Sequence, residues 1–108
     1  LRRQSRSGPT AMASVTLDGI PFECVRVPTR KTNILLIKAA GGFLGCGYFD
    51  VAVANRVGDA LAIVTGVKTI DEMLAATVVR VSDRAREAGV KEGVPGREAL
   101  LILQHFSG

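Results

Sequence analysis

Residues 41–74, GGFLGCGYFDVAVANRVGDALAIVTGVKTIDEML, show where strand-like patterning gives way to helices. A strand is expected over 43–48, and residues 50–57 can open a short helix that Gly58 stops. The apolar and largely β-branched run at 61–64 predicts the next strand. The stretch therefore predicts a strand, a short helix and a second strand before its final turn.

A second helix start follows at TIDE, residues 69–72. In such a capping box the Thr69 hydroxyl can accept a hydrogen bond from the Glu72 amide, while the Glu72 side chain reaches back. We expect this helix to bury Ile70, Met73 and Leu74.

The region before this stretch, residues 14–49, has strand-like patterning throughout. Asp18-Gly19 is a strong signal for a two-residue hairpin turn, because both residue types tolerate positive φ. The apolar run at 34–37 fits a buried strand, and the glycine pair at 41–42 predicts another turn. Four strands with short connections predict an antiparallel meander.

The C-terminal part of the sequence alternates between strand and helix patterns. Residues 77–81 predict a strand, Ser82 can N-cap a helix that ends at Gly89, and residues 95–106 predict a last helix. The expected fold is α+β, with an N-terminal antiparallel β-meander followed by short alternating helices and strands and a C-terminal helix.

Size and composition indicate one domain. The chain has 108 residues, of which 47% are hydrophobic but only 5% aromatic, and its mean hydropathy is +0.27. We interpret residues 1–11 as a flexible, basic N-terminal extension and residues 12–108 as a single α+β domain. A small domain has a limited interior, so part of the apolar surface is expected to meet another subunit; the alternative is a core that is simply rich in Ala and Val.

The net charge of +4 does not favour nucleic-acid binding. Arg2, Arg3 and Arg6 fall within residues 1–11, which contain no acid, and the remainder has 11 basic against 10 acidic residues. A three-arginine tail attracts phosphates only weakly and without sequence preference. No aromatic residue is interleaved with it to stack on bases.

Cysteine spacing and hydropathy point to a soluble, cytoplasmic protein. Cys24 and Cys46 are 22 positions apart, which matches no metal or redox motif. The longest uncharged run, residues 39–49, is too short to span a bilayer, and the N-terminus lacks the apolar core of a signal peptide. Two free thiols in a reducing compartment are the simplest interpretation, and no membrane association is expected.

Three collinear segments carry a family resemblance. They are GCG at 45–47 followed by DV at 50–51, AIVTGVKTIDEML at 62–74, and AGVKEG at 88–93 with GREAL at 96–100. On these segments the chain resembles the YunC-like family of uncharacterised bacterial and archaeal proteins, over about residues 14–103. The resemblance implies an α+β domain that forms a tetramer through its N-terminal β region. It implies no reaction.

Cys46 and Asp50 are the candidate catalytic residues. Glycines on both sides of Cys46 would let a ligand approach a reactive thiol closely, although a free cysteine also packs as a small hydrophobe, the interpretation we favour. Asp50 could act as a general base if desolvated, but an aspartate between a strand and a helix more often caps the helix. A cysteine hydrolase also needs a histidine, and the only one is His105, near the C-terminus.

Gly45, Gly47, Thr65 and Gly66 are the candidate ligand-binding residues. Thr65-Gly66 precedes the capping box, where exposed amides at a helix start could hold an anion unless the cap already uses them. One histidine, two separated cysteines and scattered acids offer no metal-ligand set. The sequence assigns no cofactor.

Two function classes remain open. The first is a small homo-oligomeric protein that binds a small ligand or a partner protein without catalysis, because catalytic side chains are scarce and apolar surface is in surplus. The alternative is an enzyme whose site lies at a subunit junction around Cys46, Asp50 and Thr65, where a second chain could supply missing groups.

Overall fold

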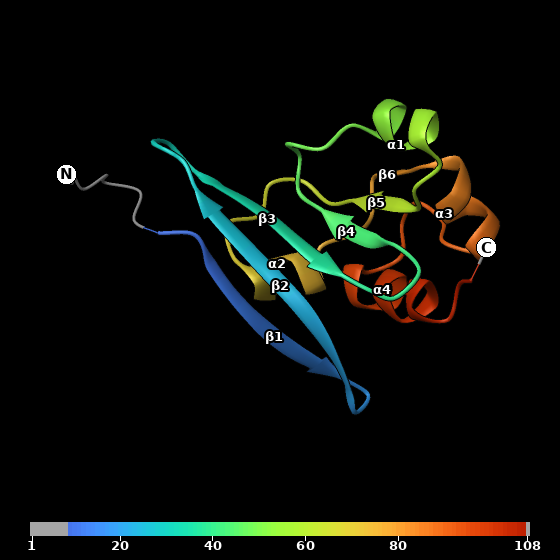
Figure 1. The fold of residues 1–108 in the computed structure, drawn as a ribbon, viewed down its shortest axis with the longest axis horizontal. Helices are drawn as coiled ribbons and strands as arrows, with labels where there is room; N and C mark the ends of the chain where they lie inside the picture. Colours follow the sequence, from blue (N-terminus) through green and yellow to red (C-terminus); the bar gives the residue numbers. More distant parts are fainter. Residues whose placement is uncertain (1–8, 108) are drawn as a thin grey trace.

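The computed structural model describes residues 9–107, in which six strands form one sheet (Figure 1). In spatial as well as sequence order these are β1 (Ala11–Leu17), β2 (Ile20–Pro28), β3 (Asn33–Lys38), β4 (Phe43–Gly45), β5 (Leu61–Ile63) and β6 (Arg80–Val81). Neighbouring strands are antiparallel except β4 and β5, which are parallel. The expected α+β fold with an N-terminal antiparallel meander is confirmed.

The first turn of the meander is the expected one. Asp18 and Gly19 both have positive φ, 52° and 80°, and the register places Leu17 opposite Ile20. Two positive φ values give a hairpin turn whose twist matches that of the flanking strands.

The apolar run of β3 is buried on one face only. Leu35 and Ile37 are fully buried, whereas Ile34 and Leu36 are half-buried. Successive strand side chains point to opposite faces, and only one face of this part of the sheet has helices packed on it. The expectation of a buried strand therefore holds for alternate residues.

Four helices follow the meander within the described residues: α1 (Val51–Val57), α2 (Ile70–Ala75), α3 (Asp83–Ala88) and α4 (Gly96–Gln104). Side chains cap the first three, because Asp50, Thr69 and Ser82 each accept a hydrogen bond from a first-turn amide. Gly58 and Gly89 end α1 and α3 with φ of 88° and 109°. None of the helices in this part of the chain is long and apolar enough to cross a membrane.

Several boundaries differ from the sequence expectations. β4 ends at Gly45, three residues early, because the Phe49 amide donates to the Cys46 carbonyl (3.1 Å) and turns the chain out of the strand. β6 has two residues instead of five, and Thr77 forms only an isolated bridge with Pro95. α4 is shorter than the expected 95–106.

The capping box and the N-terminal extension also differ from their predicted form. The Glu72 carboxylate accepts the amide of Lys68 (2.6 Å), one residue before the expected partner. Residues 1–8 of the expected extension lie outside the described residues, and β1 begins at Ala11.

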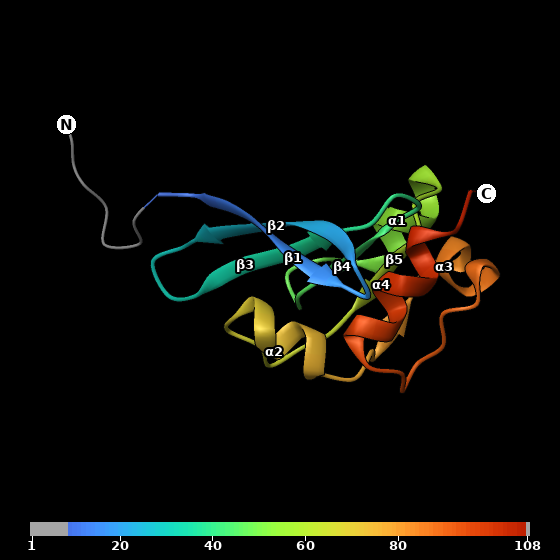
Figure 2. The ribbon, with the colours of Figure 1, turned by 90° about the horizontal axis from the view of Figure 1, so that it is seen from below.

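The helices cover the two sheet faces unequally (Figure 2). α2 and α4 pack on one face and enclose the main core, to which Phe22, Leu35, Leu44 and Leu100 belong. α1 covers the other face only at β5, over a small second cluster that consists of Ala54 of α1 and Leu61 and Ile63 of β5. No described helix covers that second face across β1–β3.

Candidate functional site

The predicted site residues gather where the two parallel strands end. β4 and β5 run in the same direction, so the loops 46–50 and 64–69 leave the sheet at one edge. The Val64 amide donates to the Gly45 carbonyl (3.0 Å), and a Cβ added to Gly47 would lie 3.5 Å from Thr65 Cγ2. The structure thus brings Gly45, Gly47 and Thr65 together around Cys46.

Cys46 itself faces the main core. Its side chain is buried, and its sulfur accepts the Leu35 amide at 3.3 Å, while its own amide donates to the Leu35 carbonyl at 3.1 Å. Cys24 is buried too, and burial raises the pKa of its thiol. Both cysteines are free. In this geometry the Cys46 thiol is a packing group and a hydrogen-bond acceptor.

The glycine before Cys46 is explained by an aromatic ring. A Cβ on Gly45 would lie 2.5 Å from Phe49 Cδ2, so Phe49 occupies the space that a larger residue would need. The Phe49 ring meets Phe43 edge to face, with centroids 5.6 Å apart. Close packing of Phe49 therefore accounts for Gly45 without a ligand.

Asp50 and the start of α2 are engaged in local hydrogen bonds. Asp50 is exposed, and its Oδ1 accepts the Ala52 amide (2.9 Å) as the cap of α1. At α2, Thr69 accepts the Glu72 amide (3.1 Å) and Glu72 accepts the Lys68 amide. The cap thus uses the amides of Lys68 and Glu72, two of the donors that could hold an anion near Thr65 and Gly66. Ligand binding by Thr65 and Gly66 stays a prediction.

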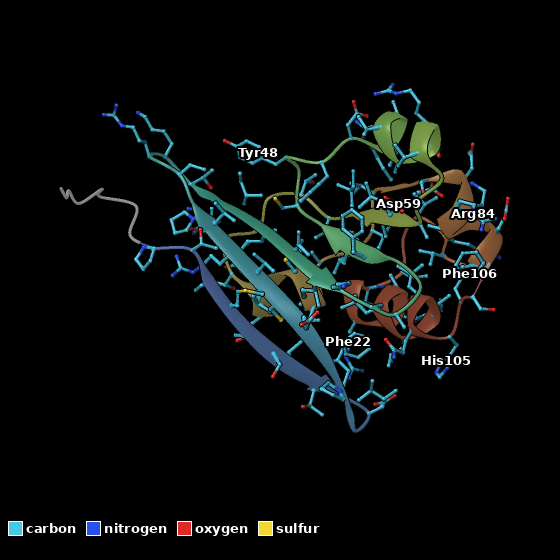
Figure 3. The ribbon with its side chains drawn as sticks, viewed as in Figure 1. Phe22, Tyr48, Asp59, Arg84, His105 and Phe106 are labelled. Atoms are coloured by element: carbon cyan, nitrogen blue, oxygen red, sulfur yellow. The ribbon has the colours of Figure 1, made fainter. Side chains whose placement is uncertain are left out.

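The single histidine lies elsewhere. His105 is exposed at the C-terminal end of α4, and it is far from Tyr48, two residues after Cys46, in Figure 3. Among residues 9–107, no group of three or more His, Cys, Asp or Glu side chains is placed to hold a metal ion.

A hollow that the sequence did not reveal opens beside the β3–β4 turn. It has a volume of about 360 Å³ and is lined by Leu36, Lys38, residues 39–42, Phe43, Phe49 and Asp59. Leu36, Phe43 and Phe49 form its apolar wall. Lys38 contributes an ammonium group and Asp59 a carboxylate group to its rim. The sequence held little sign of this hollow, because the glycines at 41–42 predicted only a turn.

The two rim charges are held differently. Lys38 Nζ lies 3.9 Å from Glu23, and both side chains are about two-thirds exposed, so water screens this pair. The Asp59 main chain is fixed, because its amide donates to the Ala54 carbonyl (2.9 Å) and its carbonyl accepts the Ser82 hydroxyl (2.8 Å). Its exposed carboxylate is therefore presented from a rigid backbone.

A smaller hollow of about 260 Å³ lies on the other side of Asp59. Arg84 and Phe106 line it, and the guanidinium carbon lies 5.4 Å from the ring centroid (Figure 3). Arg84 also forms an ion pair with Glu87 (3.0 Å), so its charge is already partly neutralised.

Comparisons with known proteins agree with the fold. A family model described as a domain of unknown function, DUF1805, matches residues 45–103. The uncharacterised protein YunC of Bacillus subtilis (strain 168) is 37% identical over 96 residues, which cover 85% of this chain and 95% of that protein. A crystal structure of a protein of unknown function from Thermoplasma acidophilum matches with a TM-score of 0.85 and 30% identity, over 94% of this chain and 99% of that one. The resemblance predicted from the sequence is confirmed.

Proposed function

The chain belongs to the DUF1805 family, whose matched relatives have no stated activity, so we propose a function from its own surface: a homo-oligomeric protein that binds a small molecule without catalysis. The ligand would occupy the hollow beside the β3–β4 turn. We place the protein in the cytoplasm, since two free cysteines suit a reducing compartment.

The hollow beside the β3–β4 turn is the observation that carries the proposal. Its volume falls at the small end of the range typical of ligand sites, which combine apolar walls with a few polar groups. Leu36, Phe43 and Phe49 offer an apolar surface, and Lys38 and Asp59 offer opposite charges at the rim. A zwitterion with an apolar side chain, such as a hydrophobic amino acid, matches this set, because it offers an opposite charge to both Lys38 and Asp59. A ligand with a single charge would leave one of these two rim groups without an opposite charge.

The uncovered sheet face supports the oligomer. Met12 is 72% exposed, and Val25, Val27 and Leu36 are half-buried on the part of the sheet face, across β1–β3, that no described helix covers. A second copy placed there would bury these side chains. Leu36 belongs both to this face and to the hollow, so the same contact would shield the ligand from water. We propose a tetramer, as the family resemblance implies.

Calorimetric titration with L-phenylalanine tests the ligand. We expect binding by the wild type, and about tenfold weaker binding by Lys38→Gln and by Asp59→Asn, each of which loses one charged contact. Lys68→Gln, on the far loop, is the matched control and should bind normally. Phenethylamine, without the carboxylate, and N-acetyl-phenylalanine, without the ammonium, should each bind more weakly. Equal binding of all three compounds would remove the argument from charge.

Native mass spectrometry of the untagged protein tests the oligomer and searches for a resident ligand. A tetramer with extra, releasable mass is the expected result, and the mass would identify the ligand. A bare monomer would contradict the proposal and direct attention to a partner protein.

An enzyme with its site around Cys46, Asp50 and Thr65 at a subunit junction is the second candidate. Its support is the meeting of two loops at the carboxyl ends of parallel strands, where ligands of α/β sheets commonly bind. Iodoacetamide on the folded protein tests it. Labelling of Cys46 but not Cys24 would favour the enzyme, whereas equal resistance of both thiols would end its cysteine form.

A further inference from the structure

Within residues 9–107, β1 forms an edge of the sheet with a definite set of donors and acceptors. It is the outermost strand, and the two-residue turn makes Leu17 and Ile20 a hydrogen-bonded pair. Alternate residues of β1 therefore direct their main-chain groups toward β2. The residues between them, Met12, Ser14 and Thr16, direct their amides and carbonyls away from the sheet, and all three are exposed.

This edge lacks the features that usually prevent strands from pairing between molecules. Its seven residues, AMASVTL, include no charged residue and no proline. The opposite edge of the sheet differs, since β6 has only two residues and one is Arg80. A long, uncharged edge strand is a template for another strand.

We infer that β1 pairs antiparallel with β1 of a second copy, about a two-fold axis at Ser14. The inference rests on the proposed homo-oligomer and adds to it a second contact, between sheet edges, beside the contact proposed for the uncovered sheet face. Outward-facing residues must meet outward-facing residues, and a centre at Ser14 pairs all three of them, Met12 with Thr16 of the second copy and Ser14 with itself. A centre at Ala13 or Val15 would pair only two.

The chemistry of β1 suits a second copy as the partner. An isologous contact sets the same side chains against each other, and an uncharged strand meets its copy without like-charge repulsion. Three hydrogen-bonded pairs supply about six main-chain hydrogen bonds. At the axis two serine hydroxyls face each other across the strands, where they can also hydrogen-bond. One sheet then continues through both copies.

Introduced cysteines test the register. In a hydrogen-bonded antiparallel pair the Cα atoms lie about 5.5 Å apart, which a disulfide can bridge. Ser14→Cys should therefore form a disulfide-linked dimer under mild oxidation. Thr16→Cys is the matched control on the same exposed edge. Its two copies would lie about 13 Å apart along the strands, and it should stay unlinked.

A mixture gives the complementary result. Met12→Cys and Thr16→Cys should each fail to cross-link alone, yet link to one another when mixed, because Met12 of one copy faces Thr16 of the other. Non-reducing electrophoresis and peptide mass mapping read out the linkage, and the wild type, whose own cysteines are buried, gives the background. Matching thermal melts of the variants and the wild type show that each still folds.

The outcomes separate this inference from the proposed function. An oligomer in native mass spectrometry whose Ser14→Cys variant does not cross-link would overturn the edge pairing and leave the homo-oligomer standing. Self-linkage of Thr16→Cys as efficient as that of Ser14→Cys would overturn the register. A wild type that stays monomeric at every concentration would overturn both proposals.

Discussion

The Leu35 amide donates to the sulfur of Cys46 over 3.3 Å, so a side chain continues the β3–β4 ladder where β4 has ended. The Cys46 amide keeps its ladder bond to the Leu35 carbonyl, but the Cys46 carbonyl has turned away and accepts the Phe49 amide. The sulfur therefore stands in for a carbonyl as the partner of a buried main-chain donor. This relationship gives Cys46 a structural role that is independent of any reaction.

Cys46→Ala is predicted to lower the free energy of unfolding by about 2 kcal/mol. The substitution leaves the Leu35 amide buried without an acceptor, in addition to the volume that is lost. Cys24→Ala is the matched control, because Cys24 is equally buried but its thiol only donates a long bond to the Phe22 carbonyl (3.7 Å). The control should cost about 1 kcal/mol. Urea denaturation measures both values, and equal costs would show that the sulfur contact contributes nothing.

Gly45→Ala is predicted to destabilise the protein by about 1–3 kcal/mol. Its Cβ would meet the Phe49 ring at 2.5 Å, and moving the ring disturbs both the Phe43 contact and the wall of the hollow. At Gly47 the same change brings the Cβ only to 3.5 Å from Thr65, an ordinary contact. Gly47→Ala should therefore stay close to the wild type in thermal melts. A tolerated Gly45→Ala would mean that Phe49 is free to move.

Local chemistry made much of the fold predictable. The Asp18-Gly19 turn, the caps at Asp50 and Ser82 and the glycine that ends α1 each depend on residues within a few positions of one another. Such signals are short-range, so one sequence contains them in full.

Long-range packing explains what the sequence did not show. β4 stops early because Phe49 folds back over Gly45, and Leu36 remains half-buried because no described helix covers its face of the sheet across β1–β3. Asp59 reaches the hollow because its carbonyl binds Ser82, 23 positions away. The hollow joins parts of the chain that are adjacent only after folding, so no local pattern marks it.

Ser82→Ala is predicted to be among the costlier single changes, at about 2–4 kcal/mol. The fully buried hydroxyl donates to the Asp59 carbonyl and accepts the amides of Leu61 (2.9 Å) and Ala85 (3.3 Å). Its loss removes a helix cap and leaves the buried Leu61 amide unpaired. Thr69→Ala also removes a cap, but at an exposed position, and should cost about 1 kcal/mol. Similar values for the two variants in urea denaturation would contradict this account.

The Arg86–Glu92 pair is predicted to make a small, pH-dependent contribution to stability. Two hydrogen bonds, of 2.8 and 3.2 Å, join the Arg86 guanidinium to the Glu92 carboxylate, and this hydrogen bonding holds the pKa of Glu92 below its ordinary value. A lowered folded-state pKa adds stability above the unfolded-state pKa, and this stability is lost as the pH falls through the folded-state value. The melting temperature of Glu92→Gln should thus lie below that of the wild type near neutral pH and converge with it in acid.

A double-mutant cycle separates this pair from the remaining surface charge. In an Arg86→Gln background, Glu92→Gln should have little further effect at any pH, because the guanidinium that lowers the carboxyl pKa is gone. High salt should shrink the wild-type advantage at neutral pH, since both side chains are about half exposed and salt screens their attraction. A Glu92→Gln penalty that persists with Arg86 removed would assign the pH dependence to the backbone around Glu92 instead of the ion pair.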